Sequence, residues 1–537
     1  MIIQIIQLSL LALIVTLVLY FIGSTFINIV SKTSLKIPRS IFFSIFWGSI
    51  IIVSLTAVIR TGFSSVFLLT IIPASFIIYQ KPKFDIISWS EWRIQMLSVP
   101  FLFLFFLTFL IFFPYTNNVE EDMPFYGKVA ESLINLGIEN TNHYFNTITL
   151  SGNATYHYFE LWFTGIIGWL TNSIFTYVLI YKYFTLPLFI TYIALAIFSL
   201  LKKKNAASQF WLSIIIISVA VLINFAPLVN FGNPAWGITH FIFSRTNFVF
   251  FYFALLPAFI YCLQYNNLSI FIGYLLFLPI LTITAAPVIF SSTIIFISII
   301  YFARLRLLSK IKTLQTLGVI LFTGLAIITF YAITGGSVVD RIANDPSSQS
   351  ILSTIFSIWK AIIHQIITLS LRLLLFATIA VLIILKIRNL ISREFYILLS
   401  YATLSGLLGI ILFQIIHTID NAYQIPYIGY SAIGVVTIIA IINFYNNSTI
   451  HYKFGLVIAV LALAINSNIR RYTPVEQTHS IEYLHLTQRG YTLKQINDFH
   501  LLLASEPTKL IEGAFYAETE KIKKPMVYQR GNDFYIL

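Results

Sequence analysis

Three acidic residues stand side by side at Glu120, Glu121 and Asp122, in a chain that is otherwise poor in charge. Only 10% of the 537 residues are charged, whereas 58% are hydrophobic. A carboxylate can take a proton from a hydroxyl group as that group attacks a substrate. The cluster therefore indicates general-base chemistry beside a membrane. The alternative is that these carboxylates are solvated charges that cap a helix.

The acidic cluster belongs to a polar stretch, residues 114–157, that interrupts apolar sequence. Tyr126 follows Asp122 by four residues, and His157 and Glu160 stand where apolar sequence resumes. His157 could bind phosphate or a divalent cation together with the carboxylates, although a lone histidine at a membrane interface is more often a structural hydrogen-bonding residue. We expect no dedicated metal site and leave the question of a divalent cofactor open.

The elements that must hold these residues are membrane-spanning helices. Apolar runs of about 20 residues, long enough to cross roughly 30 Å of hydrocarbon, recur along the chain and predict an all-α polytopic membrane protein with about 14 spans. The expected spans lie near residues 2–22, 41–60, 62–79, 94–113, 172–201, 208–228, 246–264, 268–283, 286–303, 314–333, 369–387, 395–416, 426–444 and 452–467. The single cysteine, Cys262, falls within a span and excludes an intrachain disulfide.

Basic residues are distributed unevenly between the two sets of loops. One set contains clusters such as Lys202-Lys203-Lys204, whereas the opposite set carries only Arg60, Lys128, Arg245 and Arg341. The positive-inside rule makes the first set cytoplasmic and places loop 114–157 on the extracytoplasmic face. The net charge of +13 thus reflects membrane topology, and we expect no nucleic-acid partner. Lys182, within the fifth span, has no explanation from the sequence.

Residues 125–136 have the pattern of an amphipathic helix on the outer surface. Phe125, Val129, Leu133 and Leu136 fall on one stripe, Glu131 among others faces away, and a glycine follows at position 137. A second outer helix is expected over 158–170. We predict two domains: a transmembrane domain, 1–467, that includes the catalytic loop, and a small extracytoplasmic module, 468–537, with two short strands near 526–529 and 534–537.

The order of these features resembles the first large outer loop of the GT-C fold membrane glycosyltransferases. This superfamily includes protein O-mannosyltransferases and aminoarabinose transferases. The resemblance rests on the acidic loop, the Asp-x-x-x-Tyr motif formed by Asp122 and Tyr126, the surface helix, its glycine and the aromatic return segment, and it is clearest over 94–200. Asp122 matches the catalytic base of that family. Many relatives have glutamate directly after the aspartate, where this chain has Met123, so the base is Asp122 or the preceding Glu121.

The resemblance implies a GT-C-like helical bundle in a bacterial plasma membrane. Such an enzyme moves a sugar from a polyprenyl-phosphate carrier to a glycan, lipid or protein acceptor on the outer face. Two other functions stay open: an O-antigen-type polysaccharide polymerase, and a transporter or lipid-carrier flippase. Polymerases rely on outer-loop arginines, which are few here, and transporters usually show internal repeats, which the sequence lacks.

Further polar residues are candidates for binding the substrate. Lys360, His364 and Arg372 recur at helical spacing and could hold the carrier phosphate, or could be side chains that reach out to the interface. Asp420 and Gln424 stand in one polar outer loop, and Arg245 stands in another. Residues of each loop could contact the sugar or the acceptor. Within the acidic loop, Glu120, Tyr126 and His157 complete the expected substrate-binding set.

Overall fold

The computed structural model describes most of the helical part of the chain. The described residues are 2–30, 41–62, 66–80, 88–112, 122–137, 158–171, 175, 177–198, 246–265, 267–303, 308–334, 359, 381–387, 389, 391–416, 424–449, 451–453, 527–530 and 533–536.

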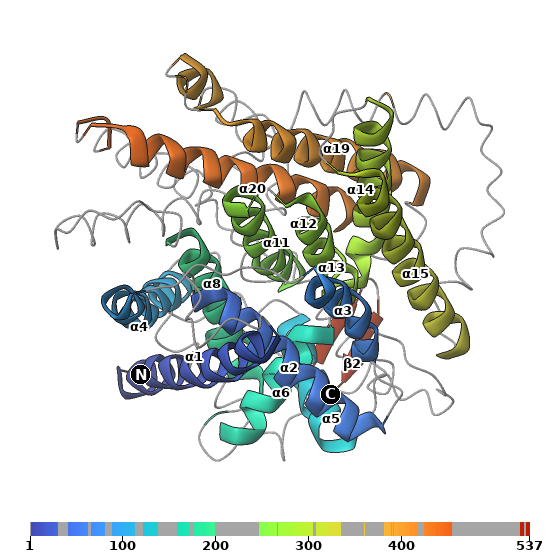
Figure 1. The fold of residues 1–537 in the computed structure, drawn as a ribbon. Helices are drawn as coiled ribbons and strands as arrows, with labels where there is room; N and C mark the ends of the chain where they lie inside the picture. The colour runs from blue at the N-terminus through green and yellow to red at the C-terminus, as the bar shows by residue number, and fades with distance from the viewer. Residues whose placement is uncertain are drawn as a thin grey trace.

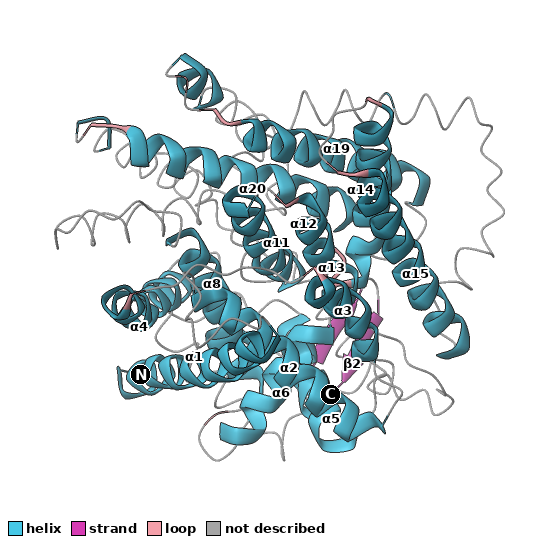
Figure 2. Ribbon diagram, viewed as in Figure 1, coloured by secondary structure: helices cyan, strands magenta, loops and turns pink. Residues whose placement is uncertain are grey.

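Within these residues the protein is helical almost throughout, which confirms the all-α fold class (Figure 2). The helices are α1 (Ile2–Val30), α2 (Ile41–Thr61), η2 (Val66–Thr70), α3 (Ile71–Tyr79), α4 (Trp89–Phe112), α5 (Asp122–Leu136), α6 (Tyr158–Thr171), α7 (Tyr177–Ile180), η5 (Tyr181–Thr185), α8 (Leu186–Phe198), α11 (Thr246–Tyr265), α12 (Leu268–Leu275), α13 (Leu278–Leu281), η6 (Ile283–Ala285), α14 (Ala286–Phe302), α15 (Lys310–Thr334), α19 (Arg393–Ile416) and α20 (Gln424–Asn447). A single antiparallel hairpin, β1 (Val527–Arg530) and β2 (Asp533–Ile536), forms where two short strands were predicted.

Four of the described helices are long and apolar enough to cross a membrane: residues 3–30, 41–61, 310–330 and 393–412. Along α1 and α15, large apolar side chains such as Ile14, Phe21, Phe322 and Ile328 are more than half exposed. A water-soluble surface would rarely carry rows of such side chains, whereas lipid tails accommodate them. The full set of about 14 spans stays a prediction, because residues 208–228 and 454–467 lie outside the described part of the chain.

The pair α1 and α2 packs backbone against backbone. A Cβ atom at Gly23 would collide with the Ser44 carbonyl oxygen, and one at Gly48 would collide with the Leu19 carbonyl oxygen. Between them, the Ser24 hydroxyl donates a hydrogen bond to the Ser44 hydroxyl at 2.9 Å. Small residues and hydroxyl pairs of this kind drive helix association in lipid, where the hydrophobic effect does not act between helices.

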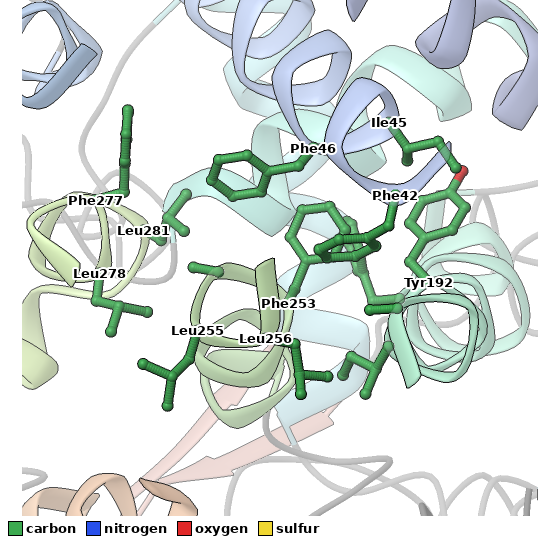
Figure 3. Close-up of a cluster of buried hydrophobic side chains, with 14 of the residues drawn as sticks. Phe42, Ile45, Phe46, Tyr192, Phe253, Leu255, Leu256, Phe277, Leu278 and Leu281 are labelled. Carbon is green, nitrogen blue, oxygen red and sulfur yellow. The ribbon is translucent and has the colours of Figure 1, made fainter. Parts of the chain in front are cut away.

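Aromatic rings fill the contact between the N-terminal helices and α11 (Figure 3). Phe42 of α2 meets Phe253 of α11 with ring centroids 4.9 Å apart, and Phe253 also packs on Tyr192 of α8 at 5.8 Å. The Tyr192 hydroxyl lies 3.1 Å from the Thr16 hydroxyl of α1, so its polar end is hydrogen-bonded within the apolar interior. This cluster joins helices far apart in the sequence into one core.

Helices α11 and α12 lie between the N-terminal helices and a second group formed by α14, α15, α19 and α20 (Figure 1). In that second group α19 packs along α20 and against α14. The Tyr401 hydroxyl of α19 lies 3.2 Å from the hydroxyls of both Ser292 and Thr293 on α14. Paired hydroxyls therefore tie α14 to α19 within an otherwise apolar contact.

Three predicted spans differ from the structure. Helix α1 continues to Val30 instead of ending near residue 22, because Gly23 meets α2 closely instead of breaking the helix. The span expected over 62–79 contains a short 3₁₀ helix and then α3, which is nine residues long. The span expected over 268–283 divides into α12 and α13, with a turn before Pro279, since proline cannot donate the helical hydrogen bond. The predicted boundary between the spans 268–283 and 286–303 is confirmed, since α14 begins at Ala286.

Candidate functional site

Helix α5 carries the residues for which the sequence predicts chemistry. It ends at Leu136, as its sequence pattern predicts, but begins at Asp122, three residues before the predicted start, with Pro124 in its first turn. Gly137 follows with a φ of 67°, and its amide donates a hydrogen bond to the Leu133 carbonyl oxygen at 3.0 Å. This is the left-handed residue that commonly ends a helix. An acidic residue at the first position is favoured by the positive end of the helix dipole.

The C-terminal end of α5 rests on the C-terminal end of α2. A Cβ atom at Gly137 would collide with the Arg60 carbonyl oxygen, so the two backbones are in direct contact there. Since α2 is one of the long apolar helices, this contact places α5 at one end of the bundle. The cytoplasmic or extracytoplasmic assignment of that end stays a prediction.

One face of α5 is buried against the bundle. Tyr126, Val129, Ala130, Leu133 and Ile134 are each at most 4% exposed. Val129 and Leu133 of the predicted stripe lie on this buried face, whereas the Leu136 side chain is 57% exposed. The buried face is rotated toward Tyr126 and Ala130 because α6 and η5 pack on that side. Helix α5 is thus packed into the protein along its length rather than only lying on a surface.

Helix α6 brings the chain back beside α5. A Cβ atom at Gly165 would lie 2.7 Å from the Ala130 carbonyl oxygen, so glycine permits this close approach. Phe159, at the start of α6, packs on Phe67 of η2 with ring centroids 6.0 Å apart. Glu160 in the same turn is fully buried. The helix predicted over 158–170 is confirmed, and its first half is buried in the bundle while Trp169 and Leu170 at its end are exposed.

The long helical segment that follows contains one π-helical turn, η5. Its defining hydrogen bond runs from the Leu186 amide to the Tyr181 carbonyl oxygen, five residues back. Pro187 comes next and has no amide hydrogen, so it cannot donate to the Tyr183 carbonyl oxygen as an α-helix would require. This explains why the helix loosens at this point. Single π-helical turns are frequent at functional sites.

Helix α6 and the segment 177–198 form an antiparallel hairpin. A Cβ atom at Gly168 would meet the ring of Tyr177, the hydroxyl oxygens of Thr164 and Thr185 lie 2.9 Å apart, and Phe163 packs on Phe189 at 5.0 Å. As the residue number decreases along α6, the number of the residue that it contacts increases along the partner segment, as antiparallel packing requires. The threonine hydrogen bond fixes the register between α6 and the π-helical turn.

Two ionisable residues are buried in this hairpin. Lys182 is 1% exposed, and its ammonium group lies 5.2 Å from the centre of the Tyr183 ring. Glu160 lies one turn before Thr164, and Lys182 lies before Thr185, so the antiparallel packing puts them on opposite sides of the threonine pair along the helix axes. Ionisable groups inside a helical membrane protein are costly and usually functional. Glu160 and Lys182 were not among the predicted site residues. The sequence feature that could have identified them is an ionisable residue within an apolar run.

The π-helical turn also contacts α5 directly. Tyr181 packs on Tyr126 with ring centroids 5.2 Å apart and planes inclined at 48°. Tyr126 is the tyrosine of the Asp-x-x-x-Tyr motif, and the structure buries its side chain in the contact between α5 and η5. Strand β1 of the C-terminal hairpin also contacts α5, so the last described residues of the chain lie beside this helix (Figure 1).

Most other predicted site residues lie outside the described part of the chain. These are Glu120, Glu121, His157, Arg245, Lys360, His364, Arg372 and Asp420. Gln424 is the first residue of α20, and for both Gln424 and Asp122 only the backbone is described. Of the predicted set, the structure therefore places Asp122 and Tyr126 on one helix, and all of the functional assignments stay predictions.

Comparison with known proteins adds no relative. No protein-family model matches the chain, and neither the curated proteins nor the solved structures give a significant match. The fold therefore defines the class of the protein, a helical membrane-embedded protein, and the candidate site is the helix that begins at Asp122.

Proposed function

We propose that the chain is an integral-membrane glycosyltransferase that moves a sugar from a polyprenyl-phosphate carrier to an acceptor. The observation that carries the proposal is the position of Asp122 at the first residue of α5, directly after the acidic pair Glu120 and Glu121. Helix α5 is anchored in the bundle at both halves, by Tyr126 and by Gly137. A carboxylate on such a helix is held at a fixed height relative to membrane-bound substrates.

The chemistry requires few groups. Transfer from a phosphate-linked sugar to a hydroxyl forms one C–O bond and breaks another, and a carboxylate takes the acceptor proton as the new bond forms. The helix dipole favours the ionised carboxylate at a helix start, which is the form that accepts a proton. The departing phosphate needs cations or hydrogen-bond donors, for which Lys360, His364 and Arg372 are the proposed residues. The acceptor is a glycan, a lipid or a protein.

The test is the replacement of each candidate base by its neutral amide. Purified protein in proteoliposomes would be given a panel of polyprenyl-phosphate hexoses and pentoses with radiolabelled sugar, and transfer to acceptor fractions would be counted. We expect Asp122→Asn or Glu121→Gln to lower transfer by roughly 100- to 10,000-fold, the usual contribution of a general base. The matched control is Asp345→Asn, at an acidic residue far from position 122 in the sequence, which should retain activity. Wild-type transfer in both base variants would end the proposal.

The alternative function, a transporter or lipid-carrier flippase, is favoured by one observation: Glu160 and Lys182 are buried beside a π-helical turn. Buried ionisable residues and interrupted helices are typical of transporters for ions or charged substrates. The internal repeat that usually accompanies such transporters is not visible in this sequence. Accumulation of a labelled polyprenyl-phosphate sugar across the bilayer, without any covalent change, would favour this alternative over sugar transfer.

A further inference from the structure

The first turns of α5 contact the π-helical turn on the face that carries Asp122. Asp122 and Tyr126 are four residues apart, so they lie on the same face of the helix and about 6 Å apart along its axis. The Tyr126 ring packs on Tyr181 of the π-helical turn at 5.2 Å. A shift of the Tyr126 ring is therefore transmitted to Asp122 within a single turn.

The π-helical turn is itself fixed in place. Tyr181 and Thr185 stand four residues apart at its two ends, and Thr185 is hydrogen-bonded to Thr164 of α6. All five residues of the turn are buried. Helix α6 in turn packs closely on α5 through Gly165. The turn thus sits on a rigid hairpin and presents Tyr181 to α5 as a fixed support.

We propose that Tyr181 is a positioning residue, which through its ring contact with Tyr126 fixes the position of the α5 backbone at Asp122 for proton transfer. This inference rests on the proposed glycosyltransferase function. Tyr181 acts only through Tyr126 and touches no reacting atom in this assignment. An error of about 1 Å in the position of a reacting group can cost about 100-fold in rate, which makes such a support consequential.

The first experiment reads the position of residue 122 without any substrate. Cys262 is the only cysteine of the chain and is 3% exposed, so a cysteine introduced by Asp122→Cys would be the reactive thiol. Its rate of modification by a membrane-impermeant maleimide would be measured in proteoliposomes. We expect Tyr181→Ala to raise this rate about 2- to 10-fold, the equivalent of one lost aromatic contact. Tyr126→Ala should do the same, and the double variant should add nothing further.

The matched control is Tyr183→Ala. Tyr183 is equally buried in the same turn, but its ring contact among the described residues is with Lys182 of that turn. It should leave the labelling rate unchanged. Equal effects of Tyr181→Ala and Tyr183→Ala, or no effect of either, would overturn the assignment. Tyr181→Leu, which keeps most of the side-chain volume, serves if the alanine variant does not accumulate in membranes.

The second experiment measures transfer with the donor that is active in the panel. Tyr181→Ala should lower kcat by roughly 10- to 100-fold while KM stays within about twofold, and Tyr181→Phe, which retains the ring, should restore kcat. A rise in KM with unchanged kcat would contradict a positioning role. If Asp122→Asn and Glu121→Gln both kept full activity, the proposed function would fail, whereas the labelling result would still decide whether Tyr181 supports α5.

Discussion

At Gly137 two separate requirements exclude a side chain. The residue has a φ of 67°, which L-amino acids with a Cβ atom adopt at a cost, and a Cβ atom would also collide with the Arg60 carbonyl oxygen. Gly62 has a similar φ of 72° but has no atom within 4 Å of the place where a Cβ would lie. A substitution at Gly62 therefore tests conformational strain alone, whereas a substitution at Gly137 tests strain together with close backbone contact.

A series of alanine variants tests this separation. Gly62→Ala should destabilise the protein by about 1–2 kcal/mol, the cost of the left-handed conformation. Gly137→Ala should cost about 1–3 kcal/mol more, because α5 must also move away from α2. Gly318→Ala, in the open middle of α15, should be neutral or slightly stabilising. Thermal unfolding in one detergent would rank the three, and equal losses at positions 62 and 137 would contradict the backbone contact.

At the scale of elements, the hairpin of α6 with α7, η5 and α8 supports α5. Glycines let the helices approach at positions 165 and 168, and one threonine pair sets the register. In lipid, such polar contacts add to van der Waals packing, and each is modest in strength. The support of α5 therefore depends on several small contacts acting together.

The threonine pair can be measured by a double-mutant cycle. Thr164→Val and Thr185→Val each remove one hydroxyl, and their coupling free energy should be about 0.6 kcal/mol, a typical value for a hydrogen bond between helices in a membrane. The matched control pairs Thr171→Val with Thr185→Val, since the Thr171 hydroxyl bonds to the Ile167 carbonyl oxygen of its own helix. That control cycle should show no coupling. Zero coupling between positions 164 and 185 would mean that the register is set by packing alone.

At the scale of the whole molecule, exposed apolar faces and the asymmetry of basic loops define how the protein sits in a bilayer. Helices α1 and α15 present large apolar side chains outward, as lipid contact requires. Helix α5 lies at the end of the bundle where α2 ends. The positive-inside rule predicts that this end lies on the extracytoplasmic side.

Reporter fusions test that orientation. An enzyme that is active only outside the cytoplasm, fused after residue 140, should be active, and the same enzyme fused after Lys204 should be inactive. A reporter that is active only in the cytoplasm should give the reverse result and serves as the control. If both sites reported the same side, the assignment of Lys202-Lys203-Lys204 and the acidic loop to opposite faces would be wrong.

The local sequence was enough to predict several elements. The helix over 125–136 and the glycine after it, the boundary between the spans 268–283 and 286–303, and the two C-terminal strands all follow from residues close together in the chain. Local signals suffice there because proline, glycine and hydrophobic period act within one or two turns. The rotation of the buried face of α5 could not be predicted this way, because it depends on Tyr181, which lies 55 positions beyond Tyr126.

By itself, the sequence determined that this is a helical membrane protein in which three of the 20 acidic residues stand side by side at positions 120–122. Composition and periodicity are properties of single segments, and they decide which segments are helices. Only the tertiary structure decided that Tyr126 is buried on a π-helical turn, and that Glu160 and Lys182 are enclosed nearby. Those facts depend on the packing of helices from distant parts of the chain, which no local pattern encodes.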